Sequence, residues 1–368
     1  MTLDAASPAR GGPEAPPGSD EPTAPAAAAP ARTAPARRAV GFALALVALA
    51  AVVLLSLALG TRDIAPATVW AAVSGSGTGS GTGDDVSVVL TLRLPRTVLG
   101  LLVGAGLGVA GALIQAVTRN PLADPGILGV NAGAAFAVAL GVGVLGITSP
   151  LGYLWFAFAG ALATTVVVYL IGSGARGPVS PARITLAGVA IGAVLAGITS
   201  AMVLANPRGY NAMRAWEAGS LADRGWEPIT TAASFLVAGL VLALLLGRSL
   251  NAVAMGDDLA RSLGARVVRT RVLSLLAITL LAGAATAMAG PIAFVGLMIP
   301  HAARWIVGPD QRWIIAYSVL LAPILVLAAD VLGRVVMRPG ELQVGIVTAV
   351  LGAPVLILLV RRARVSQL

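Results

Sequence analysis

Ten apolar stretches with almost no charged side chains constrain this 368-residue chain more than any other feature. They are residues 39–59, 96–117, 126–146, 151–171, 184–205, 229–247, 272–289, 292–303, 313–329 and 342–360. A helix of about 20 apolar residues crosses a bilayer, and backbone groups in lipid must be satisfied within the segment. The sequence therefore predicts an all-α integral membrane protein with about ten transmembrane helices. The eighth stretch is short and contains Pro300, so nine spans or a re-entrant segment remain as alternatives.

The arginines predict how these helices are oriented. All 25 basic residues are arginine, and seventeen of them fall on the inner side if the N-terminus is cytoplasmic and ten spans alternate. Because cytoplasmic segments of membrane proteins are enriched in cations, this distribution predicts an even number of spans and both termini in the cytoplasm. The formal net charge of +9 then lies on the inner side and indicates topology, so no nucleic-acid partner is expected.

Three absences restrict the chemistry of the chain. Without lysine it has no phosphate-binding loop of the ATPase type, which places a lysine ammonium on the nucleotide phosphates. Without cysteine, and with His301 as its single histidine, it has no thiolate or clustered imidazole metal site. We therefore expect no catalytic residue, metal or cofactor in this chain, and ATP hydrolysis only on another protein.

The predicted spans carry no Asp, Glu or Lys near their centres. Proton-coupled transporters place ionisable groups there. A gradient-driven carrier is therefore disfavoured. A self-contained secondary carrier or channel stands as the alternative class of function.

Residues 1–38 and 363–368 are predicted tails on either side of a transmembrane domain formed by residues 39–362. The first tail is rich in Pro and Ala and has no aromatic residue, so it cannot bury enough apolar surface to offset chain entropy. We expect it to be disordered and cytoplasmic. The apolar run after it is too long for a cleaved signal peptide and is interpreted as a retained first span.

Glycines recur inside the apolar stretches, and Gly100, Gly104 and Gly108 stand four residues apart on one helix face. Small residues at this spacing let helix backbones approach closely in lipid. We predict a tight helix contact along this face, with flexibility for gating as the alternative.

The outer end of the second span contains the motif Arg93-Leu94-Pro95-Arg96. Proline suits the first turn of a helix, so two guanidinium groups are fixed at the membrane edge. The residues alone allow two interpretations: anchoring at the interface by long side chains, or docking of a partner through pairs with its carboxylates.

The loop between the sixth and seventh spans, about residues 248–270, contains the signals of a short helix. The residues concerned are Gly256, Asp257, Asp258, Leu259, Ala260, Arg261, Leu263 and Gly264. Acidic residues suit a helix start, Asp257 and Arg261 are spaced as an ion pair, and glycine can end the helix. So short a helix is marginal alone, and it must pack either on its own chain or on a cytoplasmic partner.

Three further segments lead to local predictions. The stretch between the second and third spans is predicted to be a rigid turn in which Asn120 and Asp124 cap backbone groups. Asp330 and Arg334 are spaced as an ion pair on one helix. Residues 216–226 contain two tryptophans and are predicted to be an external interfacial segment.

These segments together resemble the permease subunits of bacterial ABC importers for ferric siderophores, haem and vitamin B12, the FecCD-type permeases. The similarity extends in order from about residue 39 to residue 362. The segments concerned are Arg93–Arg96, Gln115 with Arg119–Gly129, Gly256–Gly264, Gly290–His301, Ala328–Asp330 and Gly345–Pro354.

The resemblance implies a type II ABC importer permease with ten helices and both ends in the cytoplasm, located in the bacterial cytoplasmic (inner) membrane. It implies a second permease subunit, either identical or related, and two ABC ATPase subunits that hold ATP and Mg²⁺. It also implies an extracytoplasmic binding protein that delivers the siderophore. It offers no role for the N-terminal tail.

The resemblance also implies roles for individual residues. Arg93, Arg96 and Arg334 match external arginines that pair with carboxylates of the binding protein, and Gly256–Gly264 matches the coupling helix that contacts the ATPase. Residues 120–125 and 216–221 are most similar to the iron-siderophore branch, with haem and vitamin B12 importers as alternatives. The substrate-binding residues stay unknown.

Overall fold

The computed structural model describes residues 35–75, 83–147, 149–173, 181–205, 213–214 and 216–365. Every regular element in these ranges is helical. Most of the predicted N-terminal tail and residues 366–368 of the predicted C-terminal tail lie outside the described residues. The described helices all belong to one unit of the chain, Thr33–Leu368.

Ten of the described helices correspond to the ten predicted apolar stretches, which confirms the all-α prediction for this part of the chain. They are α1 (Pro35–Ala58), α4 (Leu94–Thr118), α5 (Val130–Gly143), α6 (Pro150–Ser173), α7 (Pro181–Ala205), α9 (Glu227–Ala254), α11 (Val267–Ala289), α12 (Val295–Val307), α13 (Gln311–Val336) and α14 (Val344–Val365). By length and composition, seven are long and apolar enough to cross a membrane, while α5, α12 and α14 provide shorter apolar helices.

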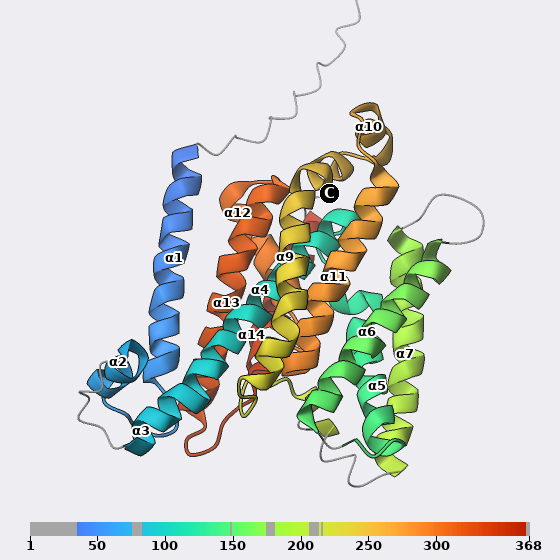
Figure 1. The fold of residues 1–368 in the computed structure, drawn as a ribbon. Coiled ribbons are helices and arrows are strands. Elements are labelled where there is room, and N and C mark those ends of the chain that lie inside the picture. The colour runs from blue at the N-terminus through green and yellow to red at the C-terminus, as the bar shows by residue number, and fades with distance from the viewer. Residues whose placement is uncertain are drawn as a thin grey trace, which may run out of the picture. The chain divides into compact units, whose positions relative to one another are not determined.

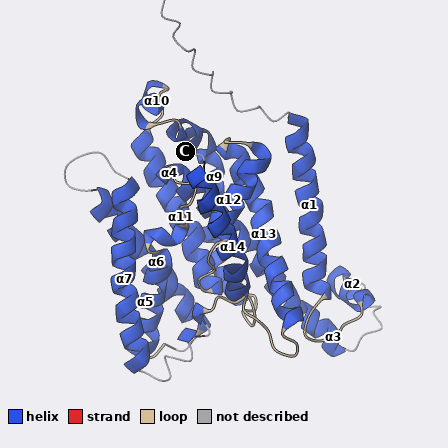
Figure 2. Cartoon of the chain, turned by 180° about the vertical axis from the view of Figure 1, so that it is seen from behind, coloured by secondary structure: helices blue, strands red, loops and turns tan. Residues whose placement is uncertain are grey.

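Short helical elements connect the long helices at the two ends of the bundle. They are α2 (Pro66–Ser74), α3 (Gly83–Val88), the π-helical turn η1 (Val89–Arg93), the 3-10 turn η2 (Pro125–Leu128) and α10 (Asp257–Ser262). The start of α1, α10 and the end of α14 lie at one end of the bundle, called here the α10 end, and α2 and α3 lie at the opposite α2 end (Figures 1 and 2). This arrangement agrees with an even number of spans.

The central helix is α4, which packs against α13, α11, α12 and α9 and is buried along most of its length. Its predicted glycine face lies against α13. A side-chain carbon added at Gly104 would lie only 2.6 Å from the Cα of Pro323, and carbons added at Gly100 and Gly108 would meet side chains of the same helix. The two helices can touch because these positions have no side chain.

Replacing Gly104 by leucine is expected to force α4 away from α13 and to lower the unfolding temperature of the protein in detergent, because the Pro323 backbone fills the space. Overpacking of this kind costs about 1–3 kcal/mol. The matched control is Gly143→Leu at the end of α5, where no atom lies within 4 Å of the added carbon. Equal unfolding temperatures of the two variants would contradict the packing role of Gly104.

A non-helical segment, residues 290–294, separates α11 from α12, so the eighth predicted stretch forms a helix of only 13 residues. Gly290 has a φ of 77°. The loop that contains Ser220 packs on this break, and the Ser220 N–H donates to the carbonyl oxygen of Ala289 at 2.7 Å. A side chain at Gly290 would collide with the carbonyl oxygen of Trp216. The helix-breaking residues before the eighth span therefore allow a contact with the loop around Ser220, which the sequence does not indicate.

Candidate docking and coupling sites

The three arginines predicted to dock a partner meet at the α2 end. Arg93, Arg96 and Arg334 line one hollow of about 220 Å³, together with Arg62 and Glu341. Arg93 belongs to η1, Arg96 to the first turn of α4, and Arg334 to the last turn of α13. The packing of α4 against α13 therefore brings the predicted group together.

Arg93 points inward and is only 5% exposed. Its Nη1 donates to the carbonyl oxygens of Leu57 at 2.8 Å and Ala58 at 2.7 Å, and its Nη2 donates to that of Arg62. Leu57 and Ala58 end α1, where helix carbonyls lack partners within the helix and a cation is favourable. Arg93 therefore fastens η1 to the end of α1.

Arg334 is 2% exposed and binds the same helix end. Its Nη1 donates to the carbonyl oxygens of Ser56 at 3.1 Å and Leu59 at 2.7 Å, and its Nη2 pairs with Asp330 at 2.9 Å. The predicted Asp330–Arg334 pair is thus confirmed. Arg93 and Arg334 point inward because the end of α1 offers them acceptors, and their docking role stays a prediction.

Arg96 is more exposed, with 12% of its side chain accessible. Its Nε and Nη2 donate to Asp330 over 2.8–3.1 Å, and its Nη1 donates to Glu341 at 2.7 Å. Asp330 is buried, so Arg96 and Arg334 share one carboxylate. Sequence spacing could not reveal the pairing of Arg96 with Asp330 and Glu341, since the partners are far apart in the chain.

At the opposite end, the predicted short helix is present as α10. Gly256 before it has a φ of 115°, and Gly264 after it has a φ of 79°, which glycine adopts without strain. Ala260 is fully buried against Val253 and Val267. One face of α10 therefore packs on its own chain.

The other face of α10 is uncovered. Leu259 and Leu263 are 48% and 61% exposed. The fully exposed Asp258 carboxylate pairs with Arg261 at 3.1 Å. The residues alone left open whether this helix packs on its own chain or on a partner. In the structure one face of α10 packs on its own chain, and an apolar face stays available for a partner.

Asp257 ties α10 to two long helices. Its Oδ1 accepts a hydrogen bond from Nη2 of Arg271 in α11 at 2.9 Å, and another from Arg119 directly after α4. Arg119 also donates from its Nε to a carbonyl oxygen near the end of α9 at 3.0 Å. The predicted Asp257–Arg261 pair is wrong, because Asp257 turns toward the bundle and Arg261 pairs with Asp258 instead. The contacts of Asp257 and Arg119 join α10 to the ends of α4, α9 and α11.

The turn between α4 and α5 has the predicted caps. The Asn120 side chain accepts a hydrogen bond from the Leu122 N–H at 3.0 Å, and that of Asp124 accepts one from the Gly126 N–H at 2.8 Å. Burial raises the pKa of Asp124, and the bond from Gly126 opposes part of the shift. The turn continues into η2, which packs against α4, α6 and α7.

Gln115 joins this turn to α12. Its amide nitrogen lies 3.3 Å from the carbonyl oxygen of Ala123 and 3.2 Å from that of Leu297, and its side-chain oxygen accepts a hydrogen bond from Arg304 at 2.8 Å. The side chain is buried. One polar residue thus connects α4, the turn and α12, a role that only its long-range contacts define.

The external segment predicted to be interfacial divides into two parts. Trp226 is 42% exposed, as expected of an interfacial aromatic residue. Trp216 is 4% exposed and lines a pocket at the α2 end, so the prediction is wrong for this residue. The loop that follows Trp216 is fixed on the break between α11 and α12 by the hydrogen bond from Ser220 to Ala289.

The described helices form a bundle of apolar spans with an ionic cluster at one end and a half-covered helix at the other, the architecture of a multi-pass membrane protein. The chain belongs to the FecCD transport family, whose sequence profile matches residues 48–362. It is 52% identical over 309 residues to the ferric enterobactin transport system permease protein FepD of Escherichia coli (strain K12), covering 84% of this chain and 91% of that protein. It is 42% identical over 277 residues to the Fe(3+)-citrate import system permease protein YfmD of Bacillus subtilis (strain 168), covering 75% of this chain and 82% of that protein.

A solved structure shares the fold. It is described as an inward-facing metal-chelate type ABC transporter, and it superposes with a TM-score of 0.77 at 24% sequence identity, covering 88% of this chain and 99% of that chain. The family inferred from the motifs, the helical fold and the membrane location are thereby confirmed.

Proposed function

We propose that this chain is the transmembrane permease subunit of an ATP-driven importer that moves a ferric siderophore across the bacterial cytoplasmic membrane. The identity of 52% to a ferric enterobactin permease supports the substrate class. The observation that best supports the subunit role is α10, with one face buried on its own chain and an apolar face uncovered. Haem or vitamin B12 is the alternative substrate, and a secondary carrier or channel is the alternative class.

The remaining parts of the importer are assigned to other chains. A second permease subunit, identical or related, forms the translocation path with this one, and two ATPase subunits hold ATP and Mg²⁺. An extracytoplasmic binding protein delivers the siderophore to the α2 end. The α10 end faces the cytoplasm, because the arginine excess lies in the segments assigned to that side.

The contacts are consistent with alternating access driven from α10. ATP binding on the partner moves α10 through its exposed leucines, and Asp257 passes the displacement to Arg119 and Arg271. Arg119 follows the last residue of α4, and Arg96 lies in the first turn of the same helix. One helix therefore links the coupling contacts to the arginine hollow, and no bond in the substrate is made or broken.

Reconstitution separates the two classes of function. Proteoliposomes with this chain, its ATPase and its binding protein should accumulate radioiron-labelled siderophore only when ATP is supplied to the ATPase. Uptake by the chain alone would overturn the importer proposal. Uptake of haem or cobalamin in place of the siderophore would move the assignment to another branch of the family.

When the binding protein docks, we expect one of its carboxylates to replace Glu341 as the partner of Arg96. The Glu341 side chain is 30% exposed and pairs with Arg96, so an incoming carboxylate must displace it. Glu341→Gln should therefore tighten docking by up to about fivefold in Kd, since an exposed ion pair contributes about 0.2–1 kcal/mol. Titration of the binding protein against the complex measures the effect, with Glu227→Gln, exposed at the start of α9, as control. Weaker docking of the Glu341 variant would argue against the exchange.

A further inference from the structure

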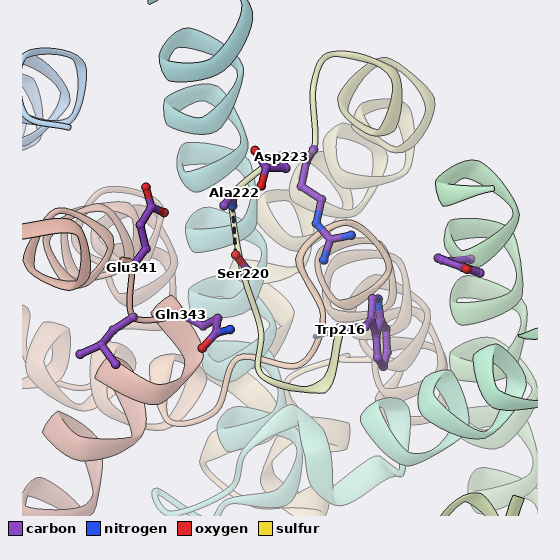
Figure 3. Close-up of a pocket in the computed structure, with 9 residues that line it drawn as sticks. Trp216, Ser220, Ala222, Asp223, Glu341 and Gln343 are labelled. Carbon is purple, nitrogen blue, oxygen red and sulfur yellow. Dashed lines mark hydrogen bonds between the residues drawn. The ribbon is translucent and has the colours of Figure 1, made fainter. Parts of the chain in front are cut away.

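A second pocket of about 490 Å³ (Figure 3) lies at the α2 end and shares lining residues with the arginine hollow. Trp216 and Arg224 line it from the segment before α9, Gln343 from the turn before α14, and Tyr153 from α6. Figure 3 shows Glu341 and Gln343 on one side of the pocket and Trp216 on the other. The volume is typical of ligand sites, which span about 300–1,000 Å³.

Two buried N–H donors of this pocket have no acceptor among the described residues. They are Nε1 of Trp216, a residue that is 4% exposed, and Nε of Arg224. A buried donor without an acceptor destabilises the folded state, and folded proteins rarely leave such groups unpaired. A ligand with acceptor oxygens would satisfy both.

The charge of the pocket points to an anion. Arg224 has no salt bridge to any described carboxylate, whereas Arg96 has two. Burial lowers the pKa of Arg224 and the nearby Asp223 opposes part of the shift, but an arginine stays protonated at neutral pH. Of the two acids that line the pocket, Glu341 is paired with Arg96 and Asp223 is exposed to solvent. Arg224 is therefore available to a negatively charged ligand.

The pocket is preformed and adjoins the docking hollow. The loop that follows Trp216 is held by the Ser220–Ala289 hydrogen bond and by a hydrogen bond from the Gly345 N–H to the carbonyl oxygen of Gly219 at 3.0 Å. The pocket and the hollow share three lining residues, Ala222, Asp223 and Glu341. A molecule released over the hollow therefore meets this pocket directly.

We propose that this pocket receives an anionic, oxygen-rich ferric chelate, bound through the N–H donors of Trp216 and Arg224 as it leaves the binding protein. The proposal rests on the importer function above and names residues that hold its substrate. Catecholate and carboxylate oxygens accept hydrogen bonds and carry negative charge, which matches the unpaired donors and the guanidinium group. Trp216 and Tyr153 add aromatic surface against flat parts of the chelate.

The test is equilibrium binding of radioiron-labelled ferric enterobactin to the permease–ATPase complex without binding protein or ATP. Arg224→Gln should weaken binding at least about tenfold, equivalent to about 1.4 kcal/mol, and Trp216→Phe, which removes the N–H and keeps an aromatic ring, should weaken it less. The matched control Arg338→Gln changes a 37%-exposed arginine outside the pocket and should leave binding unchanged. Wild-type affinity in the Arg224 variant overturns the proposal, because an intact affinity also shows that the variant is folded.

Uptake measurements separate a failure of this pocket from a failure of the proposed function. If wild-type complex binds and takes up ferric enterobactin and the Arg224 variant equals it, the pocket is rejected and the function stands. If the wild type transports haem or ferric citrate instead, and Arg224→Gln weakens binding of that chelate, the siderophore is rejected and the pocket stands. If the wild type takes up one of the three chelates but binds none of them without the binding protein, the pocket is rejected and the importer function stands. If it neither binds nor takes up any of the three, both proposals are rejected.

Discussion

Asp330→Ala is expected to destabilise the folded protein by about 3–5 kcal/mol, the typical cost of removing one partner from a buried ion pair. The Asp330 side chain is 1% exposed and pairs with both Arg96 and Arg334. Without it, two guanidinium groups stay enclosed with less compensation, and the end of α1 is held by an arginine that lacks its counter-ion. The measurement is the unfolding temperature in detergent, together with the amount of folded protein recovered from membranes.

The matched control for this prediction is Asp63→Ala at the same end of the bundle. The Asp63 side chain is 90% exposed and pairs with Arg338 at 3.3 Å. Surface pairs contribute little to stability, so the unfolding temperature should stay close to that of the unmodified protein. If Asp330→Ala behaves like Asp63→Ala, then Asp330 is not the central counter-ion of the cluster.

Ala260→Phe is expected to uncouple ATP hydrolysis from transport. Ala260 has no exposed surface and packs against Val253 and Val267, so a phenyl ring must push α10 off the ends of α9 and α11. The ATPase can still turn over, but its movement no longer reaches Arg119 and Arg271. Transport per ATP hydrolysed should fall at least about tenfold, equivalent to about 1.4 kcal/mol.

The same substitution at Ala254 controls for added bulk near the coupling contacts. Ala254 is the last residue of α9 and is exposed, so Ala254→Phe leaves the buried face of α10 intact. Both variants are compared in proteoliposomes by measuring ATP hydrolysis and siderophore uptake in one sample. Normal uptake per ATP in the Ala260 variant would count against α10 as the coupling element.

Substitutions of Arg93, Arg96 and Arg334 do not test docking equally well. Arg93 and Arg334 hold the end of α1, so their removal changes stability together with any docking contact. Arg96 and Glu341 are more exposed and form a pair that a partner can reach. Substitutions at Arg96 and Glu341 therefore test docking more directly.

Several elements were predictable because their signals are local. Apolar runs predict helices in lipid, since each helix satisfies its own backbone groups. The spacing of Gly100, Gly104 and Gly108 predicts a close helix contact, although only the structure identifies α13 as the neighbour. The start and end of α10 and the Asp124 cap of the turn likewise depend on residues a few positions apart.

Length, hydropathy, arginine distribution and motifs by themselves determined that this chain is a helical membrane permease of one family, because these properties act along the chain or within one helix turn. The tertiary structure alone decided which groups meet: Arg96 with Glu341, Asp257 with Arg119, and Arg334 with the end of α1. It also decided that Trp216 lines a pocket instead of facing lipid. The physical reason is that partners of buried charges and donors are chosen by helix packing, which brings together residues that no sequence spacing relates.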